Sequence, residues 1–279
     1  KGVEQTCTVR TPTLWSVDMP ALYKAESRLY EGDRLCDTYT TTFGIRSIEV
    51  IPDKGFFLNG ERVVFKGVCN HHDLGPLGAA VNRAAIRRQI MMLMAESFDE
   101  WNQPKCANGY NLLFNDWAEK DLVNLIHHYR NNPSVMFWCI GNEVPNQGDK
   151  EGYKVAKWLQ DICHREDPTR PVTQGMDNPD AVVSNGFAAV MDVAGFNYRP
   201  FRYVRNYNVL PQKLILGSET ASTVSSRGVY KFPVERRAMA TYDDHQSSGY
   251  DVEHCSWSNL PEDDFIQHED LPYCMGEFV

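Results

Sequence analysis

Two glutamates stand at the ends of short apolar runs. Glu143 ends VMFWCIGNE (135–143), and Glu219 ends LILGSE (214–219). Runs of this length and composition are typical of buried β-strands. A strand end holds a side chain rigidly, and two facing carboxyl groups are what glycoside hydrolysis requires. The two runs therefore indicate a retaining glycosidase.

The chemistry gives each glutamate a different role. A neutral Glu143 would protonate the leaving glycosidic oxygen, which requires a pKa raised by burial or by a neighbouring carboxylate. An ionised Glu219 would attack the sugar, with the two carboxyl groups about 5–5.5 Å apart. The competing interpretation is that each is an ordinary loop glutamate at a strand end.

The elements that must position these residues follow an alternating pattern after residue 50. Stretches 85–94, 116–129 and 153–163 are rich in helix formers or carry apolar residues at helical spacing. Between the helices lie single apolar runs, which predicts a parallel sheet. The predicted strands are 63–68, 135–140, 171–174, 193–196, 214–216 and 274–279.

Polar residues follow strand after strand, as at 70–73, 142–143, 177–178, 197–198 and 218–219. Chemistry that converges from the carboxyl ends of many strands is typical of the (β/α)8 TIM barrel. A doubly wound sheet would favour a glycine-rich phosphate turn, and the sequence has none. We therefore predict a TIM barrel over residues 49–279.

The first part of the chain has a different pattern. Runs 21–30, 34–43 and 46–51 roughly alternate apolar and polar residues, and Glu31-Gly-Asp33 is typical of a hairpin turn. This indicates an antiparallel sheet with one buried and one solvent-exposed face. Three strands are too few to close a sandwich, so residues 1–48 are interpreted as the C-terminal part of one.

Composition excludes several classes of protein. A net charge of −9 without a basic stripe argues against nucleic-acid binding. No stretch approaches the ~20 apolar residues of a membrane span, and no signal peptide is recognisable. We expect a soluble protein, with the cytoplasm and the periplasm both open. Eight scattered cysteines without a Cys-x-x-Cys pair predict neither a zinc site nor a disulfide framework.

The motifs around the two glutamates resemble glycoside hydrolase family 2, in its β-galactosidase branch. The matching segments occur in order over nearly the whole chain: 43–49, 57–62, 66–73, 96–101, 132–135, 141–143 and 218–219. The resemblance implies a TIM barrel preceded by an immunoglobulin-like β-sandwich. It also implies that Glu143 is the acid/base and Glu219 the nucleophile.

The same resemblance assigns substrate contacts. Asn142 would bind the 2-hydroxyl of the sugar, and Tyr198 would lie against the nucleophile, although Tyr198 could also be a rim aromatic. Trp101 would form an aromatic wall near the sugar, whereas Trp138 is interpreted as core. Sugar-reading side chains at the end of the first barrel strand would be His71, His72 and Asp73. A metal cluster is the alternative for these three, although adjacent strand residues point to opposite faces.

Glu100 matches a position where some relatives bind magnesium. Those relatives place a histidine two residues later, where this chain has Asn102. One carboxylate and one amide make a weak octahedral site. We therefore expect no cofactor and no stable metal, and magnesium near Glu100 is the alternative left open.

The chain departs from the family at two places. Around the Met94–Ala95 junction the second barrel strand and its helix have no counterpart, and Val279 falls inside the last strand. A missing strand leaves two unpaired edges, at a cost above the ~5–15 kcal/mol net stability of a domain. We therefore expect the sequence to omit segments of a longer protein, a real deletion being the alternative.

The first functional hypothesis is an exo-acting retaining enzyme that cleaves terminal β-D-galactosides by double displacement. Its partner would be a β-galactoside oligosaccharide or glycoconjugate, with no nucleic acid and no membrane, and a homo-oligomer is left open. The alternatives are a β-glucuronidase or another family 2 glycosidase, and a non-catalytic carbohydrate-binding remnant. Two retained carboxylates argue against the remnant.

Overall fold

The computed structural model describes residues 3–69, 93–223, 225–226, 228–238, 242–249 and 252–279. Its main body is a seven-stranded parallel sheet with the order β6-β14-β11-β10-β9-β8-β7. The strands are β6 (Phe65–Gly67), β7 (Leu93–Glu96), β8 (Val135–Asn142), β9 (Val172–Met176), β10 (Ala194–Asn197), β11 (Ile215–Glu219) and β14 (Cys274–Phe278).

The order of the strands distinguishes a barrel from a doubly wound sheet. Strands β7 to β11 are neighbours in sequence order, and the first strand of the set, β6, pairs with the last, β14. Pairing of the first strand with the last is typical of a barrel rather than of a doubly wound sheet. The predicted TIM-barrel class is therefore confirmed. Within the described residues, β6 and β7 are not paired, so the barrel has a gap between these two strands.

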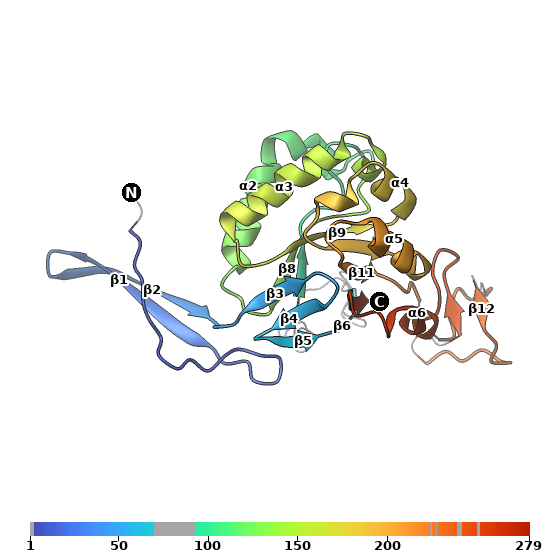
Figure 1. Cartoon of the computed structure of the whole chain (residues 1–279), viewed down its shortest axis with the longest axis horizontal. Coiled ribbons are helices and arrows are strands. Elements are labelled where there is room, and N and C mark those ends of the chain that lie inside the picture. Colours follow the sequence, from blue (N-terminus) through green and yellow to red (C-terminus); the bar gives the residue numbers. More distant parts are fainter. Residues whose placement is uncertain (1–2, 70–92, 224, 227, 239–241, 250–251) are drawn as a thin grey trace.

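Helices form a layer outside these strands (Figure 1). In α2 the buried residues Phe114, Ala118, Leu122 and Ile126 recur every fourth position, which places them on one face of the helix. The helices are α2 (Phe114–Tyr129), α3 (Gly152–Glu166), α4 (Pro179–Ser184), α5 (Tyr203–Val209) and α6 (Pro261–His268). Short 3-10 turns are η2 (Tyr110–Leu112), η3 (Pro145–Gly148), η4 (Ala188–Val190) and η5 (Pro200–Arg202).

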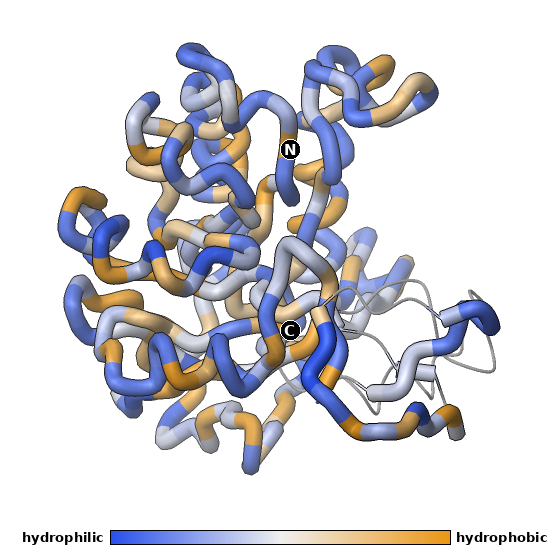
Figure 2. Tube along the Cα trace, turned by 90° about the vertical axis from the view of Figure 1, so that its right-hand side faces the viewer, coloured by the Kyte–Doolittle hydropathy of each residue, from blue (hydrophilic) through white to orange (hydrophobic). Residues whose placement is uncertain are grey.

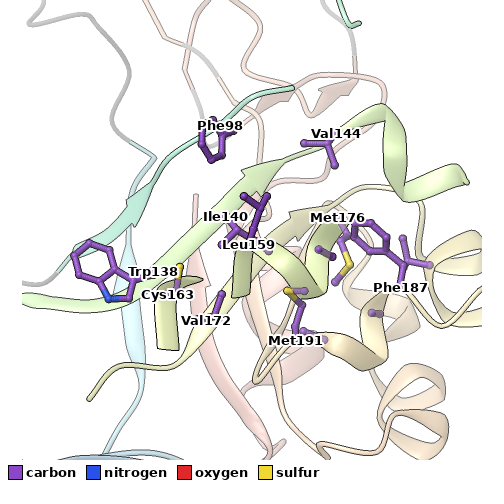
Figure 3. Close-up of a cluster of buried hydrophobic side chains, with 14 of the residues drawn as sticks. Phe98, Trp138, Ile140, Val144, Leu159, Cys163, Val172, Met176, Phe187 and Met191 are labelled. Carbon is purple, nitrogen blue, oxygen red and sulfur yellow. The ribbon is translucent and has the colours of Figure 1, made fainter. Parts of the chain in front are cut away.

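Two apolar clusters occupy the interior. At the start of β11, Ile215 belongs to one cluster and its neighbours Leu214 and Leu216 to the other, as the alternation of side chains along an extended chain requires. The larger cluster joins the strands to the helices (Figure 3). The smaller one joins residues of β6 and β14 and the start of β11 to Phe56, in the segment before β6. The tube in Figure 2 shows short hydrophobic and hydrophilic stretches following one another along the chain.

The first fifty residues differ from the prediction. Strands β1 (Tyr23–Glu31) and β2 (Arg34–Phe43) form the predicted hairpin, but nearly all of their residues are exposed. The hairpin extends away from the barrel (Figure 1), so neither of its faces is buried within the described residues. The expected third strand of that sheet is wrong, because β3 (Ile48–Ile51) pairs with β4 (Gly55–Leu58) instead. Strand β5 (Glu61–Val63) completes this second sheet.

Other predictions had mixed outcomes. Barrel strands β6, β8, β9, β10, β11 and β14 and helices α2 and α3 lie where the periodicity placed them. The helix expected over 85–94 is wrong at its end, because Leu93 and Met94 begin β7, and the remainder lies outside the described residues. The short helices α4, α5 and α6 and the pair β12 (Arg237–Ala238) and β13 (Glu253–His254) had no sequence signal. Among the described residues, none of the helices has the length and apolar character that crossing a bilayer requires.

A buried ion pair ties the helical layer to the strands. Arg170 and Asp167 form a salt bridge and are only 5% and 4% exposed. The Arg170 guanidinium also donates to the carbonyls of Arg130, Asn132 and Val135, at 2.9, 2.8 and 2.7 Å. One side chain therefore joins the end of α2 to the start of β8.

We expect Arg170→Leu to lower the free energy of unfolding by roughly 3–5 kcal/mol, because it leaves the Asp167 carboxylate buried without its cation. Urea denaturation followed by circular dichroism measures this loss. The control is Arg205→Leu, which removes an exposed ion pair to Asp180 and should cost no more than about 1 kcal/mol. Equal effects of the two substitutions would contradict the structural role of Arg170.

Candidate active site

Glu143 follows the last residue of β8 on a turn of unusual backbone geometry. Its φ of 47° is left-handed, a conformation that residues other than glycine rarely adopt. The turn is held because the Glu143 backbone N–H donates to the Gly175 carbonyl of β9 at 2.9 Å. Such local strain is typical of functional positions, where the surrounding structure fixes it.

Tyr198 repeats this geometry at the end of β10. Its φ is 53°, and its backbone N–H donates to the Glu219 carbonyl at 2.7 Å. The Tyr198 hydroxyl also donates to Oε1 of Glu219. Tyr198 thus holds Glu219 by two hydrogen bonds, one to its backbone carbonyl and one to its carboxylate.

A single amide, that of Asn197, joins the two glutamates. Its Nδ2 lies 2.8 Å from Oε1 of Glu143, 3.4 Å from Oε2 of Glu219 and 2.9 Å from Oδ1 of Asn142. Asn197 is fully buried, and its Oδ1 accepts a hydrogen bond from the Ser218 hydroxyl at 2.7 Å. Because carboxyl oxygens accept hydrogen bonds, this orientation presents the NH2 group to both glutamates.

The shared nitrogen limits the separation of the carboxyl groups. With 2.8 Å on one side and 3.4 Å on the other, the two oxygens lie at most about 6 Å apart. Retaining glycosidases hold their two carboxyl groups about 5–5.5 Å apart, whereas inverting enzymes require ~6.5–9.5 Å. The upper bound on the distance between these two oxygens lies below the inverting range.

The surroundings of Glu143 favour its neutral form. Burial raises the pKa of Glu143 above the ordinary glutamate value, and the negative charges of Asp177 and Glu219 act in the same direction. The hydrogen bond from Asn197 and the charge of Lys105 oppose this rise without cancelling it. A glutamate of raised pKa is suited to donate a proton near neutral pH.

Gly175 of β9 makes room for the amides. A Cβ at this position would lie 2.4 Å from Oδ1 of Asn142 and 3.0 Å from Oδ1 of Asn197. Strand pairing sets Gly175 directly opposite Asn142, and Asn197 directly opposite Glu219. The absence of a side chain on β9 therefore lets the polar groups of β8 and β10 meet above it.

The structure brings together four of the residues that the sequence singled out: Asn142, Glu143, Tyr198 and Glu219.

Trp101 does not join these four residues. Its indole is fully buried, packs against Phe114 and Phe187, and donates from Nε1 to the Ile140 carbonyl at 2.9 Å. The expected aromatic wall is therefore corrected to a core residue, because the indole has no exposed face for a sugar. Trp138 is core, as expected. The predicted contacts His71, His72 and Asp73 lie outside the described residues.

The residues near Glu100 do not fit a metal ion. The Glu100 carboxylate is 4% exposed and accepts hydrogen bonds from the backbone N–H groups of Lys105 and Asn111 at 2.6 and 2.9 Å. These bonds lower the pKa of Glu100, with Asn111 as the largest cause. N–H groups aimed at the carboxylate occupy the positions that a cation would need. Glu100 thus anchors the loop that carries Lys105, and within the described chain no group of three or more His, Cys, Asp or Glu side chains is placed to hold a metal.

Sequence reasoning did not assign a role to Asn197 or Lys105. Asn197 lies in a predicted strand end beside Tyr198, so the convergence of polar strand ends was the available signal. Lys105 lies in an irregular loop, from which its Nζ donates to the Asn142 carbonyl and to Asp99, both at 3.0 Å. No periodicity could have placed it there.

Fold and site together define a class. A parallel barrel whose strand ends bring two glutamates together has the layout of many glycosidases. Models of one family match two parts of the chain: the glycosyl hydrolases family 2 model over residues 1–46, and its TIM barrel domain over residues 114–250. The chain belongs to glycosyl hydrolases family 2.

Individual relatives agree on the family and differ in the named substrate. The chain is 31% identical to the β-galactosidase BoGH2A of Bacteroides ovatus, over 99% of this chain and 40% of the relative. It is 29% identical to a β-glucuronidase of Bacteroides fragilis, over 59% of this chain and 28% of the relative. A crystal structure of a β-glycosidase from Bacteroides vulgatus superposes with a TM-score of 0.79 at 27% identity, covering 97% of this chain and 41% of that one. The chain therefore spans less than half the length of these relatives.

We expect Gly175→Ala to lower kcat roughly 10²-fold, the scale of a ~1 Å displacement of catalytic groups. The new methyl group would displace the Asn142 amide, the end of a side chain, rather than the backbone. Steady-state kinetics and thermal unfolding check this together, since the melting temperature should change little. An unchanged kcat in the folded variant would contradict the proposal that the site needs a residue without a side chain at position 175.

Proposed function

We propose that this protein is a retaining exo-glycosidase that hydrolyses terminal β-D-galactosides, with Glu219 as nucleophile and Glu143 as acid/base. The observation that carries the proposal is the Asn197 amide, whose nitrogen lies within hydrogen-bonding range of both glutamates. A separation of at most about 6 Å supports retention over inversion.

In the first step, an oxygen of Glu219 forms a bond to the anomeric carbon. The bond from that carbon to the aglycone oxygen breaks, and Glu143 transfers its proton to the departing oxygen. In the second step, Glu143, now ionised, removes a proton from water. The water oxygen attacks the anomeric carbon, and the Glu219 carboxylate leaves. The configuration at the anomeric carbon is inverted twice and so retained.

The neighbouring groups assist particular stages. The Tyr198 hydroxyl donates a hydrogen bond to the Glu219 carboxylate, so it would orient this carboxylate for attack. The side-chain oxygen of Asn142 accepts a hydrogen bond from Asn197. The NH2 group of Asn142 therefore points away from Asn197, and in this proposal it faces the bound sugar. A hydrogen bond from this NH2 to the 2-hydroxyl would strengthen as the oxocarbenium-like transition state develops.

The choice of galactoside is supported by the β-galactosidase of Bacteroides ovatus, which matches nearly the whole chain. The second candidate is a β-glucuronide, since several relatives carry that name. Aryl β-galactoside and aryl β-glucuronide assayed side by side separate the two. Turnover of neither glycoside by the folded protein would contradict both candidates.

Glu219→Gln should lower kcat by roughly 10⁴-fold or more, because it removes the nucleophile of a concerted catalytic unit. Turnover of an aryl β-galactoside measures the loss. Glu269→Gln is the matched control: it changes an exposed glutamate just beyond α6 and should keep wild-type activity. A Glu219→Gln variant within tenfold of wild type would exclude Glu219 as nucleophile.

Glu143→Gln should depend on the leaving group. An alkyl galactoside needs a protonated aglycone and should lose roughly 10²–10⁴-fold, whereas an activated aryl galactoside should lose much less in its first step. Azide, which needs no general base, should restore turnover of the aryl substrate as the β-galactosyl azide.

The pH profile provides a second measurement of Glu143. In the wild type, activity should fall as pH rises through the Glu143 pKa, which burial raises above the ordinary glutamate value. This alkaline limb should disappear in Glu143→Gln. If the limb persists unchanged in the variant, Glu143 is not the acid.

A further inference from the structure

The peptide bond that joins Asn142 to Glu143 carries the candidate acid/base, and both of its polar groups are held. Its N–H, which belongs to Glu143, donates to the Gly175 carbonyl of β9 at 2.9 Å. Its carbonyl, which belongs to Asn142, accepts a hydrogen bond from Nζ of Lys105 at 3.0 Å. The left-handed φ of Glu143 directly follows this peptide. The two bonds therefore fix the turn from which the Glu143 side chain projects.

The lysine replaces a backbone donor that β7 does not supply. Along the β7 side of β8, the Ser97 N–H donates to the Cys139 carbonyl at 3.0 Å, and the Asn142 N–H donates to the Phe98 carbonyl at 2.9 Å. The N–H and carbonyl of one strand residue face the same neighbour, so the Asn142 carbonyl is the next acceptor on this side. The segment after Phe98 is irregular and does not continue the strand. The Lys105 ammonium takes the place of the missing N–H.

The loop that carries Lys105 is fixed at its base. The buried Glu100 carboxylate accepts the backbone N–H groups of Lys105 and Asn111 at 2.6 and 2.9 Å. At the other end of the side chain, the ammonium also donates to the Asp99 carboxylate at 3.0 Å. The Lys105 side chain is 29% exposed. Backbone and ammonium are thus both held, and the position of the charge next to the Asn142 carbonyl is built into the loop.

Negative groups surround Glu143, and the charge of Lys105 opposes them. Burial is the largest cause of the raised pKa of Glu143, and the charge of Lys105 acts to lower that pKa. Among the described residues, the titratable groups whose charges act on Glu143 are the carboxyl groups of Glu96, Asp177 and Glu219, the phenol of Tyr198 and the ammonium of Lys105.

Resting on the function proposed above, we propose that Lys105 is a positioning residue for the acid/base, whose ammonium holds the Asn142–Glu143 peptide and supplies the positive charge beside Glu143. In the proposed mechanism Glu143 is protonated at the start and ionised after the first step. A nearby cation stabilises the ionised form, which must then remove a proton from water. Lys105 acts through the peptide and through its charge rather than through contact with the sugar, so it affects the rate more than substrate binding.

A metal ion near Glu100 is the alternative source of positive charge. The Glu100 carboxylate already accepts backbone N–H groups. The side-chain oxygen of Asn102 is occupied as well, because it accepts a hydrogen bond from Nδ2 of Asn146 at 2.7 Å. Both side chains that would bind the metal are therefore used within the protein, whereas the Lys105 ammonium points to the peptide of the acid/base.

Steady-state kinetics over a range of pH test the proposal on wild type, Lys105→Met, Lys105→Arg and the control Lys157→Met. The substrates are phenyl β-D-galactoside and phenyl β-D-glucuronide, and melting temperatures check folding. We expect Lys105→Met to lower kcat roughly 10–100-fold, the scale of losing a hydrogen bond to a charged group, with little change in KM. Lys157 forms an exposed ion pair with Asp161 on α3, so its variant should equal wild type.

The pH profile separates the charge of Lys105 from a purely structural role. The positive charge favours ionised Glu143, so its removal raises the pKa of Glu143 and keeps the acid protonated to higher pH. In Lys105→Met the alkaline limb of kcat/KM should therefore move up by about 0.5–1 pH unit, less than the 1–3 units of a close buried pair. Lys105→Arg keeps the charge and should keep the limb at the wild-type pH.

A measurement on wild type alone tests the source of the charge. Activity should be unchanged after treatment with EDTA, because the groups near Glu100 are occupied by hydrogen bonds. Activity that is lost in EDTA and restored by magnesium would overturn the proposal by assigning the charge to a metal ion.

The outcomes separate this inference from the function on which it rests. Wild-type kcat and an unmoved alkaline limb in Lys105→Met would overturn the role of Lys105 and leave the glycosidase proposal intact. A lower kcat with an unmoved limb would overturn the contribution of the charge. An equal loss in Lys157→Met would overturn the assignment of the effect to the site. Wild-type protein that hydrolyses neither glycoside would overturn both proposals.

Discussion

The candidate site depends on one buried amide placed between two carboxyl groups. Asn197 has no exposed surface, and its NH2 group contacts Glu143, Glu219 and Asn142. Two carboxylates at this separation repel each other, and the repulsion raises the pKa of one of them. The amide reduces this cost without adding a charge. It therefore allows the close pairing while leaving Glu143 with a raised pKa.

The barrel supplies the geometry that this amide needs. Parallel strands present their carboxyl ends at one edge, so β8, β10 and β11 deliver Glu143, Asn197 and Glu219 to the same place. The register between β10 and β11 shifts after Phe196, which sets Asn197 opposite Glu219. Left-handed backbone at Glu143 and Tyr198 then ends each strand abruptly. Each of these strained residues is held by a backbone hydrogen bond to a neighbouring strand, so rigidity of the sheet becomes rigidity of the site.

These relations explain what could be read from the sequence. Apolar runs ending in Asn142-Glu143 and Ser218-Glu219 predict strands and catalytic carboxyl groups together, since both depend on local pattern. The burial of Trp101 depends on packing against Phe114 and Phe187, which belong to other segments, so the family resemblance gave it the wrong surroundings. The pairing of β3 with β4 rather than with the hairpin was missed for a similar reason. An alternating strand carries no information about which partner it will choose. The contacts of Asn197 join separate segments, for which periodicity has no signature.

The division between strand ends and irregular segments also bears on substrate choice. The two candidate glutamates come from the ends of β8 and β11, whose positions the sheet fixes. The segment between β13 and α6 is irregular and is joined to residues beyond the strand ends through Arg199 and Ser222. A substitution in such a segment can change its own contacts without moving either glutamate, because the register of the strands holds the glutamates. Relatives named for galactosides and for glucuronides can therefore share one barrel.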